Sequence, residues 1–256
     1  MSELSGHAAR AIEVTKVHAD GKGVACVLQR LSLDVPGNEL TVIMGPSGSG
    51  KSTLLHCFAG LDRVTSGHIV IGDQDITTLS DAKLTALRRE RIGLVFRECD
   101  LVPDLTVGRN IRLPLSLARR KIDKEWFDYI GRAMQLEKLF NQMPARLSDA
   151  QRQRATIARA LINKPGIIFV DEPTDILDSR SSEELLALLR TFVDEMRQTI
   201  LMVTRSPIVA SYAHSVVFLS DGRIVDRVTS PTLDGILDRI KALSSADDPR
   251  SQRQSA

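Results

Sequence analysis

The chain has 256 residues, and its 34 lysine and arginine residues nearly balance 32 aspartate and glutamate residues, for a formal net charge of +2. This balance gives no electrostatic case for nucleic-acid binding, so we expect no nucleic-acid partner. Hydrophobic residues make up 43% of the sequence, as in an ordinary globular protein, yet no apolar run approaches the roughly 18 residues of a membrane-spanning helix. Two basic runs, 88–91 and 119–121, are interpreted either as solvated helix faces or as contacts with an acidic partner.

The compartment is predicted from the N-terminus and the cysteines. Residues 1–10, MSELSGHAAR, lack the apolar core of a signal peptide. Cys26, Cys57 and Cys99 are widely spaced and show no metal-ligand pattern, which fits a reducing compartment. We therefore expect a cytoplasmic protein whose membrane association depends on a partner. The polar composition of 244–256 and the N-terminal 1–10 predict flexible tails.

Strands and helices alternate along the rest of the chain. Alternating apolar and polar residues predict an antiparallel element near the N-terminus, and short β-branched runs further on are typical of buried parallel strands. The predicted strands lie at 11–18, 27–35, 40–44, 92–96, 166–170, 199–203 and, on either side of an Asp-Gly turn, within 215–228. The predicted helices follow 52, span 81–91, cover most of 123–164 with a break at Pro144, and follow Asp178. This order predicts an α/β fold with a mostly parallel sheet.

A phosphate-binding loop is predicted after the strand at 40–44. The loop is built from residues that match G-x-x-x-x-G-K-[ST], namely Gly45, Pro46, Ser47, Gly48, Ser49, Gly50, Lys51 and Ser52, and Thr53 continues into the helical stretch. Backbone N–H groups and the helix N-terminus would point at phosphates. Lys51 is expected to reach the β- and γ-phosphates, and Ser52 to bind Mg²⁺. An ordinary glycine-rich turn is the alternative, but both flanks of the motif favour a phosphate loop.

A second acidic site follows the strand at 166–170. Asp171 is expected to hold the Mg²⁺ shell at the end of that strand. Glu172 is expected to accept a proton from an attacking water, or to orient it. The alternative is that both acids only cap the following turn.

With both motifs in place, the chain resembles the ATP-binding subunits of ABC transporters over 11–230. The segments that carry the resemblance are GPSGSGKSTLL, GLDRVTSGHIVIGDQDITTLS, DLVPDLTVGRNIRLPL, RATIARALINKP and VDEPTDILD. They are most similar to a branch that contains lipoprotein-releasing, macrolide-exporting and cell-division ATPases. Membrane partners in that branch typically act as mechanical transmissions rather than simple pores.

The resemblance implies a P-loop NTPase domain with a RecA-like core over 11–230 and an inserted helical subdomain over roughly 97–164. It also implies ATP and Mg²⁺ as cofactors, a membrane permease, and a second ATPase subunit that is either identical or different. The chain would then lie on the inner face of the cell membrane. In this family two subunits face head to tail, and each ATP lies between the phosphate loop of one and the signature motif of the other.

The signature segment departs from the family's LSGGQ, because Asp149 and Ala150 replace its two glycines. Ser148 and Gln151 are kept and predict a capping box for the next helix. Asp149 suits the positive end of its own helix, but it would face the γ-phosphate of the opposing ATP. At about 5 Å and an effective dielectric near 20, each pair of unit charges costs about 3 kcal/mol, which would weaken closure about a hundredfold or more.

Other family positions are also changed. Arg97 stands where the family has a glutamine that senses Mg²⁺ and water, but arginine has no acceptor and its charge repels Mg²⁺. Arg205 replaces a histidine and can touch a γ-phosphate, but it cannot exchange a proton near neutral pH. His18 takes the place of the aromatic residue that stacks on adenine. Asp178 of the D-loop is kept, behind the substituted residues 175–176.

Two functions stay open. In the first, the chain is an ATPase subunit that powers a transporter of the transmission or export type. In the second, it is a degenerate subunit that binds ATP, hydrolyses it weakly and supports an active partner. A soluble ABC protein of repair or translation is disfavoured, because the chain has neither paired cassettes nor a long insert. The transported substrate cannot be read from this chain.

Overall fold

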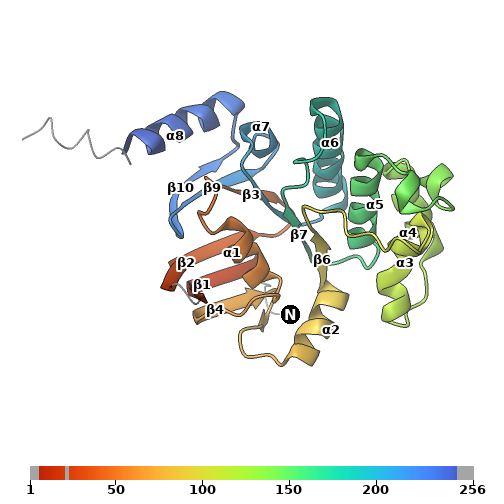
Figure 1. Ribbon diagram of the computed structural model, residues 1–256, viewed down its shortest axis with the longest axis horizontal. Coiled ribbons are helices and arrows are strands. Elements are labelled where there is room, and N and C mark those ends of the chain that lie inside the picture. Colours follow the sequence, from red (N-terminus) through yellow and green to blue (C-terminus); the bar gives the residue numbers. More distant parts are fainter. Residues whose placement is uncertain (1–5, 21–22, 247–256) are drawn as a thin grey trace, which may run out of the picture.

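The computed structural model describes residues 6–20 and 23–246, which form two β-sheets and a group of helices to one side (Figure 1). The smaller sheet is antiparallel and has four strands in the order β2-β1-β4-β5. These strands are β1 (His7–Asp20), β2 (Gly23–Pro36), β4 (Ser66–Ile71) and β5 (Gln74–Asp75). The predicted antiparallel element near the N-terminus is confirmed.

The larger sheet has six strands in the order β10-β9-β3-β8-β7-β6. Its strands are β3 (Leu40–Met44), β6 (Ile92–Val95), β7 (Ile167–Asp171), β8 (Ile200–Thr204), β9 (Ser215–Ser220) and β10 (Arg223–Thr229). Neighbours from β9 to β6 run parallel, and only β10 is antiparallel to its neighbour. The predicted α/β fold with a mostly parallel sheet is therefore confirmed.

The helices divide between the sheet and a separate helical part. Their bounds are α1 (Lys51–Phe58), α2 (Asp81–Arg91), α3 (Val107–Leu117), α4 (Lys124–Ala133), α5 (Asp149–Leu161), α6 (Ser179–Met196), α7 (Pro207–Ala210) and α8 (Leu233–Ala246), with short 3-10 helices at Glu137–Leu139 and Pro144–Arg146. Helices α3, α4 and α5 gather beside the β6 and β7 end of the sheet (Figure 1). They lie within the range predicted for the helical subdomain.

Apolar side chains alternate between the two faces of the large sheet. Val42, Ile168 and Met202 belong to a buried cluster shared with the helical part, whereas Ile43 and Phe169 belong to a second cluster shared with α1 and the small sheet. Because strand side chains alternate in direction, each central strand is covered on both faces. This explains why 40–44, 167–170 and 200–204 are nearly continuous apolar runs rather than alternating ones.

The parallel register brings the ends of several strands to one edge. Met44 pairs with Thr204, and Asp171 pairs with Val203, so the residues that follow β3, β7 and β8 leave the sheet together. In open parallel sheets, this carboxyl edge is where ligands bind. The predicted phosphate loop and the predicted acidic pair meet there because of this register.

Both predicted tails extend too far into the fold. Residues 7–10 belong to β1, because Ala9 is buried between Val35 of β2 and Ile71 of β4. At the other end, α8 runs from Leu233 to Ala246 and buries Ile236, so the fold continues beyond 230 and includes 244–246. The rest of both predicted tails, 1–5 and 247–256, lies outside the described residues.

Candidate functional site

The predicted phosphate loop joins β3 to α1 and packs closely against the backbone of β9 and β2. A Cβ atom at Gly45 would lie 2.0 Å from the carbonyl oxygen of Leu219 in β9. Gly50 has a φ of +101°, and a Cβ atom there would lie 2.8 Å from the carbonyl oxygen of Val27 in β2, so side chains are excluded at both ends of the loop. No side chain caps α1, and its first N–H groups therefore remain available to an anion.

Lys51 is buried under this loop. Its Nζ atom donates to the carbonyl oxygens of Gly45 at 2.9 Å and Pro46 at 2.7 Å. Burial lowers the pKa of Lys51, Glu172 and Asp171 oppose that effect, and Arg205 adds to it. The ammonium group thus lies beside the predicted phosphate loop, where its hydrogen bonds to carbonyls could be exchanged for bonds to phosphate oxygens.

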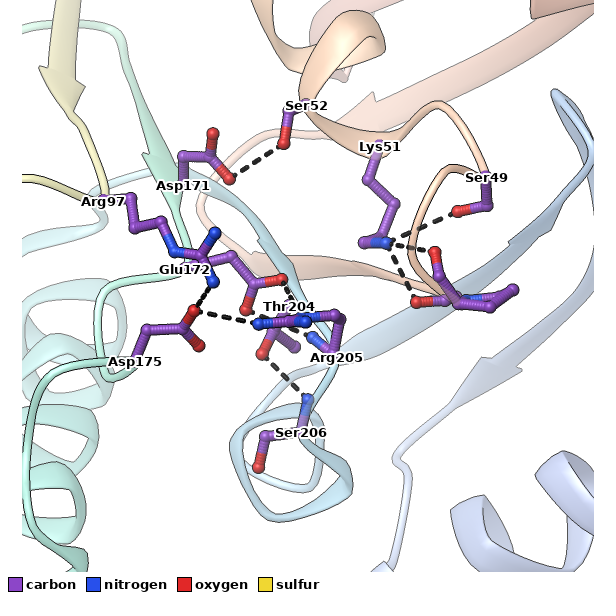
Figure 2. A network of polar contacts seen from close by, with 12 residues as sticks. Ser49, Lys51, Ser52, Arg97, Asp171, Glu172, Asp175, Thr204, Arg205 and Ser206 are labelled. Carbon is purple, nitrogen blue, oxygen red and sulfur yellow. Dashed lines mark hydrogen bonds and ion pairs between the residues drawn. The ribbon is translucent and has the colours of Figure 1, made fainter. Parts of the chain in front are cut away.

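Ser52 and Asp171 bring the loop and the acidic strand end together. The Oγ atom of Ser52 donates to Oδ1 of Asp171 at 3.2 Å, which joins α1 to β7 (Figure 2). Burial raises the pKa of Asp171, and the hydrogen bond from Ser52 lowers it. Two adjacent oxygen donors suit Mg²⁺, which usually takes one or two protein oxygens together with phosphates and waters. Within 6–20 and 23–246, no group of three His, Cys, Asp or Glu could hold a metal without such help.

Glu172 is buried, and its carboxylate contacts Arg205. It follows β7 with a φ of +43°, a left-handed conformation that is uncommon for a residue with a side chain. Its backbone N–H donates to Val203 at 3.0 Å, which anchors it to β8. The backbone N–H of Arg205 donates to Oε2 at 3.2 Å, and Nε of Arg205 forms an ion pair with Oε1 at 3.3 Å. The predicted water-activating carboxylate is thus held by an arginine.

Arg97 and Arg205 meet at a residue that sequence reasoning did not assign to the site. Asp175 Oδ2 accepts from Nη2 of Arg205 at 3.0 Å and forms an ion pair with Nη2 of Arg97 (Figure 2). We call Arg97, Glu172, Asp175 and Arg205 the ion cluster. Three of its members are the substitutions noted separately in the sequence, and the structure makes them one unit. The available signal was their opposite charges at positions that follow β6, β7 and β8.

The signature segment begins α5 and forms the predicted capping box. Gln151 N–H donates to Ser148 Oγ at 3.2 Å, and Ser148 N–H donates to Gln151 Oε1 at 2.9 Å. Asp149 forms an ion pair with Arg152, a partner that the sequence prediction missed. The negative charge of Asp149 is therefore partly compensated on the same helix, and the repulsion estimated for an isolated carboxylate is an upper limit.

The signature and the phosphate loop lie in different parts of the chain. Helix α5 packs on α3, α4, α6 and β6, whereas α1 packs on β2, β4, β7 and β8 (Figure 1). Ala150 and Gln151 thus belong to the helical part, and Gly48 and Thr53 to the part around α1.

The two remaining predicted positions have local contacts. The ring of His18 lies 3.9 Å from Asp62, beyond the far end of α1, and among the described contacts none joins it to the phosphate loop. Asp178 caps α6 by accepting from the backbone N–H of Ser181 at 2.8 Å, and hydrogen bonds from Ser181 lower its pKa. Asp178 therefore has a clear structural role in this chain.

Comparison with known proteins finds similar sequences over most of the chain. The model of the ABC transporter family matches residues 28–175. The bacitracin export ATP-binding protein BceA of Halalkalibacterium halodurans is 40% identical over 200 residues, which are 77% of this chain and 79% of that protein. The macrolide export ATP-binding/permease protein MacB 1/2 of Paracoccus denitrificans is 38% identical over 91% of this chain, which spans 36% of that longer protein.

Similarity extends to a solved structure. The ATP-binding cassette MJ0796 of Methanocaldococcus jannaschii, in a dimeric post-hydrolysis state bound to ADP and Pi, superposes with a TM-score of 0.80. It is 35% identical to this chain, and the match covers 87% of this chain and 99% of the solved chain.

Proposed function

The chain belongs to the ABC transporter family as an ATP-binding subunit, and we propose that it binds Mg-ATP at the loop between β3 and α1 and works on a membrane permease. The observation that supports this site best is the 3.2 Å hydrogen bond between Ser52 and Asp171. It places a hydroxyl and a carboxylate beside the uncapped N-terminus of α1, where phosphate oxygens would complete the coordination of a metal ion.

Each group of the site has a separate proposed task. The loop N–H groups and Lys51 bind the phosphates, and Ser52 and Asp171 hold Mg²⁺, which supplies positive charge to the phosphate oxygens when bound. Glu172 orients the attacking water or accepts its proton. For that task, the carboxylate has to give up at least one of its two contacts with Arg205, the ion pair or the hydrogen bond, for a hydrogen bond with water.

The proposed partners are a membrane permease and a second ATPase subunit. The Paracoccus relative is named as an ATP-binding/permease protein, and the MJ0796 cassette was solved as a dimer. No described helix of this chain has the length and apolar character needed to cross a bilayer. We propose that the chain is held on the inner face of the membrane by the permease, with the α3 region as the contact.

A weakly hydrolysing subunit is the second candidate function. It is favoured by one observation, the engagement of both Glu172 oxygens by Arg205. Paired with a subunit whose signature is intact, this chain would complete one competent site and spoil the other. Steady-state hydrolysis by the lone chain separates the two functions, because vigorous turnover that depends on Glu172 contradicts the second.

Crosslinking in cells tests the transporter role. Native Cys26 and Cys99 are first changed to Ser, because Cys26 is exposed and Cys99 half-buried. Single cysteines are then placed at two exposed positions, Asp104 just before α3 and Ser116 near its C-terminal end. We expect both to capture a permease, and an exposed cysteine at Glu183 on α6 not to. Capture of soluble proteins alone would contradict a transporter subunit.

A further inference from the structure

The ion cluster changes the charge of the phosphate end of the site. Three cations and three carboxylates surround this end, namely Lys51, Arg97, Arg205, Asp171, Glu172 and Asp175. If 97, 175 and 205 were neutral, one cation would face two carboxylates. A tetra-anionic triphosphate would then depend on Mg²⁺ for its neutralisation. The two arginines and Asp175 together add one net positive charge, which takes over part of the neutralisation that Mg²⁺ would otherwise supply.

The two arginines keep donors available for a ligand. A guanidinium carries five N–H donors in a planar fork. Among the described contacts, Arg205 uses Nε and Nη2 on carboxylates and Arg97 uses Nη2. The side chains of Arg97 and Arg205 are 50% and 48% exposed, so their remaining N–H groups can reach a bound molecule.

Asp175 fixes where these donors lie. Its Oδ2 atom accepts from both arginines, and its side chain is only 23% exposed. Two long cationic side chains are thereby held together beside Glu172 instead of spreading into solvent (Figure 2). The donors of a guanidinium group match the geometry of phosphate oxygens. Here both guanidinium groups are already held in place by Asp175 before any ligand binds.

We propose that Arg97 and Arg205, positioned by Asp175, bind the phosphate oxygens of ATP directly, so that this chain binds ATP tightly without a divalent cation. The inference rests on the proposed nucleotide site, and it concerns binding and not hydrolysis. Mg²⁺ still fits between Ser52 and Asp171, but it is not required for the triphosphate to stay bound.

Calorimetric titration of the full chain with a non-hydrolysable imido analogue of ATP tests this inference, in Mg²⁺ and in EDTA. We expect the dissociation constants in the two solutions to agree within about threefold, because the guanidinium bonds persist without metal. In the double variant Arg97→Gln, Arg205→His, we expect EDTA to weaken binding at least about tenfold. The control Arg180→Gln, Arg239→His removes the same charge from exposed sites and should behave as the unmodified chain.

The outcomes separate the inference from the function on which it rests. A loss of affinity in EDTA that is as large for the unmodified chain as for the double variant overturns the inference and leaves the nucleotide site intact. Equal tolerance of EDTA by both proteins also overturns it, since the arginines would then not be responsible. Absence of binding in both solutions refutes the nucleotide site itself. If the double variant does not fold, Arg97→Lys, Arg205→Lys keeps the charge and removes the fork, and an intermediate loss in EDTA is expected.

Discussion

The Nε atom of Arg205 lies 3.3 Å from Oε1 of Glu172, and the backbone N–H of Arg205 donates to the other oxygen of the same carboxylate. The two residues follow neighbouring parallel strands, β7 and β8, so the sheet itself fixes their contact. A carboxylate that already accepts one hydrogen bond from an arginine and forms an ion pair with the same residue is less available to a water molecule. We therefore expect this contact to slow ATP hydrolysis, and the predictions below test it.

The first prediction is that Arg205→His raises ATP hydrolysis. The change frees a carboxylate oxygen of Glu172 and introduces a group that exchanges protons near neutral pH. Since a positioned acid or base typically contributes about 10²–10⁴ in rate, we expect an increase of about tenfold or more, larger with Arg97→Gln. Steady-state phosphate release measures it, and Glu172→Gln should abolish the gain. An unchanged rate would show that Arg205 does not restrain Glu172.

The second prediction concerns nucleotide affinity. Lys51→Ala removes the buried ammonium group at the phosphate end of the loop. Hydrogen bonds to charged groups contribute about 1.5–3 kcal/mol, so we expect ATP binding to weaken about tenfold to a hundredfold. Equilibrium dialysis with labelled ATP measures the affinity, and the exposed Lys83→Ala on α2 is the matched control. Binding that is unchanged in Lys51→Ala means that the phosphate loop is wrongly assigned.

The third prediction is a dependence of stability on pH at Asp171. Burial raises its pKa in the folded state, so the ionised carboxylate destabilises the fold, and this cost disappears as protonation sets in at lower pH. Asp171→Asn keeps an acceptor for Ser52 and removes the charge. We expect a higher melting temperature than the unmodified chain at neutral pH, and a difference that shrinks in acid. Melting curves recorded across pH without nucleotide check this. If the difference in melting temperature between the variant and the unmodified chain grew in acid, the ionised carboxylate would stabilise the fold, and the prediction would be wrong.

The fourth prediction tests the close backbone contact under the loop. Gly45→Ala places a methyl group 2.0 Å from the carbonyl oxygen of Leu219, and backbone cannot move aside cheaply. Overpacking of this kind typically costs about 1–3 kcal/mol, and the loop should lose its shape for phosphates as well. Denaturant unfolding measures the stability, with Gly166→Ala as the control, because the nearest atom there is 3.8 Å away. Equal stability of the two variants would show that β9 does not crowd the start of the loop.

Local patterns were enough to predict the elements that build the site. The strand at 40–44 and the helix at 81–91 have the predicted bounds. The strand is buried on both faces and therefore forms a short apolar run, and the helix is marked by its many charged residues. Strand β4 and helix α8 were not predicted. Strand β4 is held by pairing with β1, and α8 packs on α7, and both of these contacts join segments that are distant or irregularly spaced in the sequence.

Contacts between residues that are distant in the sequence could not be predicted from the sequence alone. Arg97 and Asp175 are 78 residues apart, and only the parallel register of β6, β7 and β8 makes them neighbours. Each substitution alone therefore indicated a lost function, whereas together they form bonds with one another. The ion pair between Asp149 and Arg152 is different, because the two residues are three positions apart on one helix. Such a pair can be predicted from the sequence, but the sequence analysis considered Asp149 alone.

The last prediction concerns pairing of two subunits. In the family arrangement, Asp149 would face the γ-phosphate held by the opposing chain, with Arg152 compensating part of its charge. Asp149→Gly with Ala150→Gly should therefore restore ATP-driven pairing, and Arg152→Ala should weaken it further by exposing the uncompensated carboxylate. Sedimentation velocity with ATP, in a Glu172→Gln background that prevents turnover, measures both effects, and Asp104→Gly removes a charge elsewhere as the control.

The glycine variant should pair without full turnover, because Arg205 still holds Glu172 in chains that keep that carboxylate. If the unmodified signature supports pairing as strongly as the glycine variant, Asp149 does not oppose closure, and slow hydrolysis would then have to arise at the ion cluster alone.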